Sequence, residues 1–324
     1  MNYHIIDLHC DSIMYCMEDG MQLRDMDTHI NLAKLREGGS LVQCFALFIR
    51  TNESAKKHGL DKYSAYELYQ MMLKTFKEQI AKNSDLIEQV YSSEEIKAKK
   101  DKGKLLALLT VEDSAPVEGR IERYDELYAD GVRMMSLTWN YENCVAFPCS
   151  ADPVLHHCRG LKPFGFEALE KMNSLGIIAD TSHLSERGFW DVVEHCKKPF
   201  VSSHSCARAL CSHQRNLTDQ QLKALADKGG MVGINFCGGF LEDGNFDNAS
   251  IETVVKHLVH MKNVVGAEAI GWGSDFDGIE TKLEWKDFSG MPLLVDALRP
   301  HFSEDELEKL CYKNFLRVMK DNEA

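Results

Sequence analysis

Residues 105–112 read LLALLTVE, an almost uninterrupted apolar run that ends on the carboxylate of Glu112. A run without alternating polar residues is typical of a strand that is buried on both faces of a parallel sheet. Seven further runs share this character: IIDLH (5–9), LVQCFALFI (41–49), GVRMMSLTW (131–139), GIIADTS (176–182), PFVSSH (199–204), GMVGINF (230–236) and AIGWGSDF (269–276). The sequence therefore predicts eight buried parallel strands.

Helical patterns occupy most of the segments between these runs. Residues 61–82 repeat apolar side chains every three or four positions, as an amphipathic helix does. Thr218 with Gln221, and Ser303 with Glu306, have the spacing of a capping box, which marks the start of a helix. The sequence therefore alternates strands with helices.

This alternation in an undivided chain predicts an α/β fold, a (β/α)8 TIM barrel, with a single domain over residues 1–324. The alternative fold is a doubly wound open sheet. That fold would need a nucleotide fingerprint, but GWGSDF (271–276) supplies only the first two glycines of G-x-G-x-x-G.

Composition and charge narrow the class of protein. The net charge of −13 argues against a general nucleic-acid binder, which needs a basic face. The start MNYHIIDLHCDS lacks the basic and apolar regions of a signal peptide, and we expect no membrane span. The eleven cysteines are odd in number and form no C-x-x-C pair. We therefore expect a reduced, cytoplasmic protein that does not associate with membranes.

Acidic and imidazole side chains gather where the predicted strands end. The carboxyl ends of barrel strands form the face on which barrel enzymes place their active sites. Singly, each residue has an ordinary explanation as a helix cap or a solvated polar group. Six of them at the ends of five strands favour a functional site: His9, Asp11, Glu112, His183, His204 and Asp275.

These residue types suit a divalent metal. Imidazole nitrogens and carboxylate oxygens bind Zn²⁺ or a similar first-row ion without any thiolate. Two residues two apart on a strand point to the same side, so His9 and Asp11 can reach one ion. Glu112 can offer one oxygen to each of two ions about 3.5–4 Å apart. We expect His183 and His204 to complete the second ion's ligands.

Several motifs together resemble the membrane (renal) dipeptidase family of the amidohydrolase superfamily. The likeness runs in order from about residue 5 to 318, and GSDFDG, the SHS-x-A-R segment (203–208) and the RN pair are its most specific parts. The motifs are HCD (9–11), VED (111–113), LTWN (137–140), PFG (163–165), DTSH (180–183), SSHS (202–205), RN (215–216) and GSDFDG (273–278).

The resemblance implies two zinc ions per chain, although the ligands alone would accept Mn²⁺, Co²⁺ or Fe²⁺. By this match His9 and Asp11 bind the first ion, Glu112 bridges, and His183 and His204 bind the second. The family pattern also implies that Asp275 is the catalytic acid/base for attack by a metal-bridging hydroxide. It further implies that Arg215 holds the substrate's terminal carboxylate, and that a homodimer is a common state.

The sequence departs from the family in the substrate pocket. Some relatives carry a histidine after the fourth strand, where this chain has Trp139, and Asn140 or Asn143 is a candidate for the missing polar contact. NFCGGF (235–240) also differs, since relatives often carry a tyrosine there. We therefore expect Trp139 and Asn140 to contact the substrate and to influence its identity.

Residues 140–162 form a long irregular stretch, which we interpret as a substrate-facing loop rather than an additional metal site. The resulting hypothesis is a dizinc dipeptidase that also accepts a C-terminal D-residue. The alternatives are an amidohydrolase for another small amide, such as an N-acyl amino acid, and a catalytically silent binding barrel.

Overall fold

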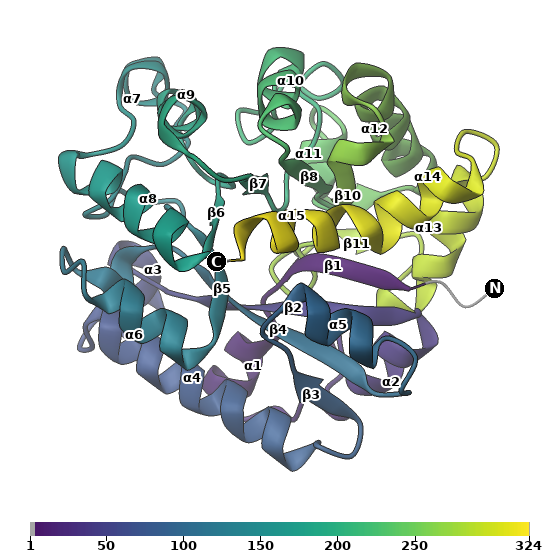
Figure 1. Cartoon of the computed structure of the whole chain (residues 1–324), viewed down its shortest axis with the longest axis horizontal. Coiled ribbons are helices and arrows are strands. Elements are labelled where there is room, and N and C mark those ends of the chain that lie inside the picture. Colours follow the sequence, from purple (N-terminus) through teal and green to yellow (C-terminus); the bar gives the residue numbers. More distant parts are fainter. Residues whose placement is uncertain (1–3, 324) are drawn as a thin grey trace.

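The computed structural model describes residues 4–323 and contains a closed barrel of eight parallel strands (Figure 1). Neighbouring strands follow the order β2-β1-β10-β8-β7-β6-β5-β4, and pairing of β2 with β4 closes the ring. Its strands are β1 (Ile5–Cys10), β2 (Ser40–Phe48), β4 (Leu105–Glu112), β5 (Val132–Ser136), β6 (Ile178–Asp180), β7 (Val201–Ser202), β8 (Met231–Ile234) and β10 (Ile270–Trp272). Each corresponds to one of the eight apolar runs, and the predicted TIM barrel is confirmed.

Several barrel strands are shorter than the runs that predict them. The strand β7 has two residues and β6 has three, so the rest of each run continues as loop beyond the strand end. Three short strands were not predicted. These are β3 (Ile87–Gln89), which pairs with β4 outside the ring, and β9 (Asn248–Ala249) with β11 (Lys282–Leu283), which form a separate parallel pair.

Helices surround the barrel (Figure 1). The capping boxes at Thr218 and Ser303 are both present, and a third one begins at Ser64. The helices are α1 (Ser12–Glu18), α2 (Leu32–Glu37), α3 (Asn52–Lys57), α4 (Ala65–Lys82), α5 (Ser93–Lys99), α6 (Arg123–Asp130), α7 (Pro153–Cys158), α8 (Pro163–Leu175), α9 (Glu186–His195), α10 (Asp219–Asp227), α11 (Gly238–Leu241), α12 (Ile251–Val265), α13 (Met291–Leu298), α14 (Glu304–Glu308) and α15 (Asn314–Asn322). A π-helical segment, Lys309–Lys313, joins α14 to α15.

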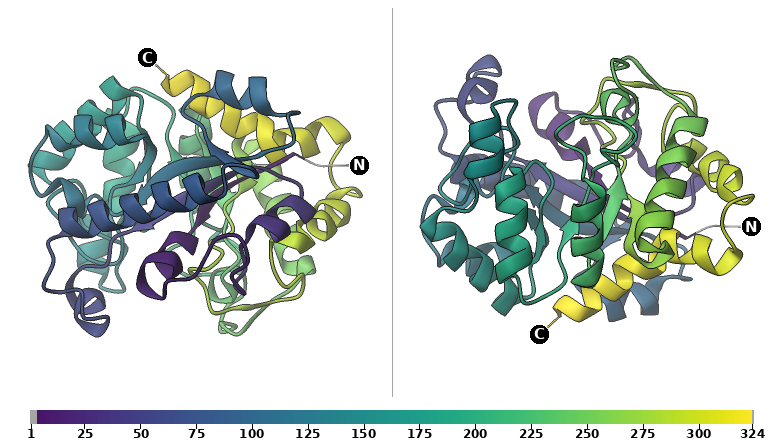
Figure 2. Two further views of the ribbon diagram at one scale, coloured as in Figure 1. Left: turned by 90° about the horizontal axis from the view of Figure 1, so that it is seen from below. Right: turned by 90° about the horizontal axis from the view of Figure 1, so that it is seen from above.

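One end of the barrel is sealed by apolar packing. Strand side chains such as Leu8 and Leu108 share a buried cluster with Phe315 and Val318 of α15. The helices α5 and α15 lie side by side across this end (Figure 2), and Ser93 Oγ of α5 donates to Glu323 Oε2 at 3.0 Å. The opposite end, where the strands terminate, is therefore the one that can hold a polar site.

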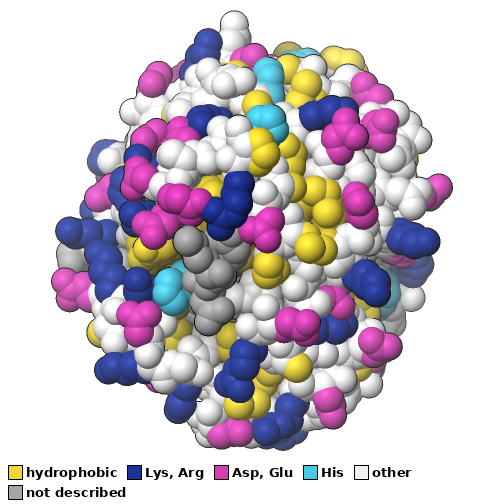
Figure 3. All heavy atoms as spheres, turned by 90° about the vertical axis from the view of Figure 1, so that its right-hand side faces the viewer, with side chains coloured by type: hydrophobic (Ala, Val, Ile, Leu, Met, Phe, Trp, Pro, Cys, Tyr) yellow, Lys and Arg dark blue, Asp and Glu magenta, His cyan; other side chains and the backbone are white. Residues whose placement is uncertain are grey.

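Within residues 4–323, none of the helices combines the length and the apolar character that a membrane crossing requires. On the face of the molecule shown in Figure 3, Lys and Arg side chains are interspersed with Asp and Glu, without a continuous basic patch. The single-domain assignment of residues 1–324 stays a prediction.

Candidate metal centre

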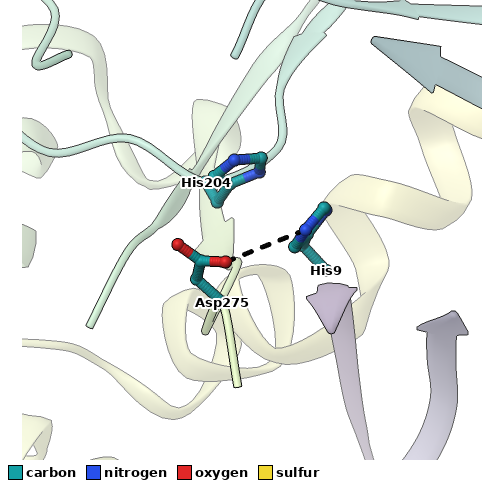
Figure 4. A group of neighbouring side chains, drawn as sticks. All are labelled: His9, His204 and Asp275. Carbon is teal, nitrogen blue, oxygen red and sulfur yellow. Dashed lines mark ion pairs between the residues drawn. The ribbon is translucent and has the colours of Figure 1, made fainter. Parts of the chain in front are cut away.

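The predicted ligands meet at the carboxyl ends of the barrel strands. His9 lies near the end of β1 and Glu112 is the last residue of β4, while His183, His204 and Asp275 lie in the loops after β6, β7 and β10. His9, His204 and Asp275 point toward one another (Figure 4). Asp275 is partly buried and the other four are buried. Asp11 is also close to His9.

Asp11 lies just beyond β1, at the residue that precedes α1. The register of β1 against β2 also shifts between Asp7 and Cys10, so simple strand alternation does not describe this segment. The side chain of Asp11 nevertheless reaches His9, and it makes no capping hydrogen bond to α1. The two side chains are therefore close together, but strand alternation is not the reason, because Asp11 lies beyond the end of β1. Their binding of one ion stays a prediction.

The first group of ligand atoms surrounds His9. Its Nε2 lies 3.4 Å from Asp11 Oδ2, 3.6 Å from Glu112 Oε2 and 3.8 Å from Asp275 Oδ1. His9 Nε2 and Asp11 Oδ1 are buried without a hydrogen-bond partner among residues 4–323. Buried polar atoms are normally satisfied, so these two indicate a missing partner.

The second group surrounds the other oxygen of Glu112. Oε1 lies 2.9 Å from His183 Nε2 and 3.6 Å from His204 Nε2. The two Nε2 atoms are themselves 3.0 Å apart. Glu112 thus directs one carboxylate oxygen to each group, which is the arrangement that a residue bridging two metal ions requires.

Hydrogen bonds on the far side of each ring determine the tautomer of these histidines. His183 Nδ1 lies 2.9 Å from Asn140 Oδ1, an acceptor, so Nδ1 must carry the proton. His204 Nδ1 lies 2.7 Å from Ser203 Oγ. Ser203 Oγ donates its own proton to Asp180 Oδ2 at 2.5 Å, so it accepts from His204.

Both Nε2 atoms therefore present lone pairs toward each other and toward Glu112. Such an array is repulsive by itself and becomes favourable around cations. Together with the unpartnered atoms of the first group, it fits divalent metals with mixed nitrogen and oxygen ligands.

Electrostatics of the protein alone support the same interpretation. Burial and the neighbouring Asp11 carboxylate raise the pKa of Glu112 to about 8. Burial, reinforced by Asp11, raises the pKa of Asp275 to about 6 despite the opposing charge of His9. Burial disfavours charge on His9, but Asp11 and Glu112 outweigh it and raise the pKa of that imidazole well above its usual value. The negative charges of these neighbouring carboxylates repel one another, and bound cations would reduce this repulsion.

The motif GSDFDG has a steric explanation. Asp275 and Asp277 have φ values of 62° and 68°, so both residues occupy the left-handed region. A side chain at Gly278 would bring its Cβ to 2.2 Å from Asp11 Oδ2 and 2.6 Å from Asp275 Oδ1. Only glycine allows this approach. Asp277 accepts from Ser12 Oγ at 2.6 Å, consistent with the structural role expected for it.

Asp11, Glu112, His183 and Asp275 line a cleft of about 790 Å³. Trp139 and Asn140 line it, and the Trp139 ring packs edge-on against Phe48 at 4.7 Å between ring centroids. Asn140 uses its oxygen to hold His183. Asn143 is fully occupied elsewhere, since it donates to Asp113 Oδ1 at 2.6 Å and to a backbone carbonyl and accepts two backbone amides.

Arg215 lies apart from the cleft wall. It is 8% exposed and lines a second, much smaller cavity of about 10 Å³. Its Nε and Nη2 have no hydrogen-bond partner in the described part of the chain. Its guanidinium carbon lies 5.4 Å from the centre of the Phe240 ring, and Phe240 lines the cleft. Burial lowers the pKa of His183 well below its usual value, and the charge of Arg215 is the next cause.

The stretch 140–162 contributes Asn140 to the cleft and contains the helix α7. Its role as a substrate-facing loop stays a prediction. Three further residues near the site were not predicted from the sequence: Asp180, Ser203 and Asn235, whose Nδ2 donates to Asp275 Oδ2 at 2.9 Å. Asp180 and Ser203 lie inside the motifs DTSH (180–183) and SSHS (202–205). Their closeness in sequence to His183 and His204 could have indicated that they support the ligands.

The chain matches a known protein family over its whole length. The family model described as membrane dipeptidase (peptidase family M19) matches residues 1–324. An uncharacterized protein in the pqqA 5′ region of Klebsiella pneumoniae is 38% identical over 228 residues, covering 67% of this chain and 83% of that protein. An uncharacterized dipeptidase of Schizosaccharomyces pombe is 31% identical over 339 residues, covering 98% and 80%.

Among solved structures, a metallopeptidase from Rhodobacter sphaeroides, liganded with a phosphinate mimic of the dipeptide L-Ala-D-Ala, has a TM-score of 0.90. The match covers 99% of this chain and 100% of that one, at 24% identity. At this identity the likeness concerns the fold.

Proposed function

The chain belongs to the membrane dipeptidase family, peptidase family M19, and is a metal-dependent peptidase; on this premise we propose that it is a dizinc dipeptidase. One observation carries the proposal: the buried cation of Arg215, two of whose donor atoms lack a hydrogen-bond partner among residues 4–323, lies 5.4 Å from the centre of the Phe240 ring, and Phe240 lines the cleft that also contains Glu112 and His183. A substrate that offers both a scissile amide and a nearby carboxylate would satisfy both features.

The metal ligands follow from the two groups of atoms. His9, Asp11 and Glu112 would hold one ion, and Glu112, His183 and His204 the other. Zinc suits this mixture of imidazole and carboxylate donors, and other first-row divalent ions are chemically acceptable. When bound, the metals supply Lewis-acid activation of water and of the scissile carbonyl.

Asp275 would move the proton. Asn235 holds Oδ2 at 2.9 Å, and Oδ1 faces the first group, 3.8 Å from His9 Nε2. This orientation lets Asp275 Oδ1 take a proton from the attacking water and pass it to the leaving amine.

Arg215 would bind the C-terminal carboxylate of the substrate. A guanidinium fork donates two parallel hydrogen bonds to a carboxylate, and a substrate without that group would leave the buried cation unpaired. Because the fork recognises the carboxylate and not the configuration at Cα, the proposal includes dipeptides with a C-terminal D-residue. Trp139 would form an apolar wall for a side chain, and the amide nitrogen of Asn140 remains for a substrate carbonyl.

A substrate panel tests the proposal. It compares L-Xaa-L-Yaa, L-Xaa-D-Yaa, N-acyl amino acids and C-terminal dipeptide amides on the zinc-loaded protein. We expect the dipeptides with a free carboxylate to have the highest kcat/KM. A preference for N-acyl amino acids would replace the proposal with the other amidohydrolase hypothesis, and no turnover of any amide would support a silent binding barrel.

A further inference from the structure

A second arginine holds the backbone on both sides of Arg215. Arg208 lies in the same segment between β7 and α10. Its Nε donates to the carbonyl of Asn216 at 2.9 Å, and its Nη2 donates to the carbonyl of Gln214 at 3.0 Å. These are the carbonyls of the two residues that flank Arg215. One guanidinium is therefore hydrogen-bonded to the backbone on both sides of Arg215.

The remaining terminal nitrogen of Arg208 ties this segment to a helix. Nη1 donates to Glu186 Oε2 at 2.7 Å, and Glu186 is the first residue of α9. The two side chains are 20% and 23% exposed. Three acceptors in three directions match the planar fork of arginine, whereas a lysine ammonium cannot hold that geometry.

The side chain of Asn216, the residue after Arg215, makes further hydrogen bonds to the backbone. Its Nδ2 donates to the carbonyls of Cys211 at 3.0 Å and Phe240 at 2.8 Å, and its Oδ1 accepts from the amide of Cys206 at 3.2 Å. The backbone around Arg215 is therefore held at several points. By contrast, the Nε and Nη2 atoms of Arg215 have no partner within residues 4–323.

Glu186 also lies near His156 and His157, a grouping with metal-like spacing. The Glu186 carboxylate, however, is already paired with the permanent cation of Arg208. A guanidinium 2.7 Å away disfavours a second cation at the same oxygen. Glu186 is therefore better placed for an ion pair with Arg208 than for metal binding.

We propose that Arg208, anchored by Glu186, is a positioning residue that orients Arg215 for the substrate carboxylate. This inference rests on the proposed function of Arg215. A bidentate contact tolerates little displacement, so a loosened backbone on either side of Arg215 weakens carboxylate recognition without touching the metal ligands. The selectivity for a free C-terminal carboxylate then depends on a residue that does not contact the substrate.

The test compares a dipeptide with its C-terminal amide in the zinc-loaded protein. For Arg208→Met we expect the ratio of kcat/KM between the two substrates to fall on the order of tenfold, mainly through a higher KM for the dipeptide. Glu186→Gln keeps the shape of the anchor and loses its charge, so it should lower the same ratio by less. Arg24→Met removes an arginine from an exposed ion pair with Asp85 and should leave the ratio unchanged.

A double variant separates positioning from general damage. If Arg208 acts through Arg215, Arg208→Met should not lower the ratio further when Arg215→Met is already present. An equal loss for both substrates, or a full additional loss in the double variant, would overturn the proposal. A failure of the proposed function looks different, because Arg215→Met alone would then leave the ratio unchanged. Zinc content and thermal unfolding establish that each variant is folded and loaded.

Discussion

The Nε2 atoms of His183 and His204 lie 3.0 Å apart, and each ring uses its Nδ1 for a hydrogen bond on the far side. Two imidazole lone pairs therefore converge on the same space as Glu112 Oε1. Metal binding would convert this repulsive arrangement into a favourable one. The stability of the protein would then depend on its metal content.

Removal of metal should destabilise the protein. We expect about two equivalents of a divalent metal in the purified protein, a lower Tm after chelation, and recovery on reloading with Zn²⁺. At a free metal concentration of 100 times the Kd, binding of one ion raises the free energy of unfolding by about 2.7 kcal/mol. Elemental analysis and calorimetry measure both effects. His204→Ala should lose metal, whereas His260→Ala, which removes a partner of Asp219 on the outer helices, should not. Metal-free protein that cannot be reconstituted would refute this prediction.

Asp275→Asn should remove the proton acceptor and keep the shape of the side chain. We expect kcat to fall by about 10²–10⁴-fold, the usual contribution of a positioned acid or base. Metal content should stay near that of the unmodified protein, because Asp275 is not among the five proposed ligands. Turnover at the original rate would show that another group carries the proton.

Arg215→Met should impair recognition of the substrate carboxylate. Loss of a charge-assisted bidentate contact costs about 1.5–3 kcal/mol, which corresponds to roughly 10–150-fold in kcat/KM. A C-terminal dipeptide amide should lose much less, since it carries no carboxylate. Steady-state kinetics with both substrates give the comparison, and equal losses would contradict a role in carboxylate binding.

Asp180→Asn and Ser203→Ala should weaken metal binding without removing a ligand. Asp180 accepts from Ser203 Oγ, which in turn accepts from His204 Nδ1, so the pair sets the orientation and tautomer of that ring. Changes to such outer partners typically cost about 10–100-fold in metal affinity. Competition with a chromogenic chelator measures it. Ser205→Ala is the matched control, because its hydroxyl pairs with Ser202 instead of the ring.

His156 should make stability depend on pH. Burial, with the nearby charge of Arg208, lowers the pKa of this imidazole to about 4 from 6.5. Between these values the unfolded chain binds a proton that the folded protein does not, so stability falls as pH decreases. The effect from pH 7 to pH 5 is about 2 kcal/mol. His156→Leu should flatten the pH dependence of denaturant-induced unfolding; an unchanged slope would contradict the prediction.

Much of the fold could be predicted from local patterns. A strand such as 105–112 must be continuously apolar because both faces are covered, and this requirement is visible in the sequence. Capping boxes at Thr218 and Ser303 are equally local, since the atoms involved lie within three residues. The short strands β3, β9 and β11 have no such signature, because two or three residues carry too little pattern.

The candidate site divides in the same way. The sequence by itself determined that His9, Glu112 and His204 stand where strands end, because barrel topology brings all such ends to one face. Only the tertiary structure decided that Glu112 directs its two oxygens to separate groups and that Asn140 holds His183. It also decided how Arg208 holds the segment that carries Arg215. These relationships join residues distant in the chain, and their geometry depends on closure of the barrel and on the paths of its loops.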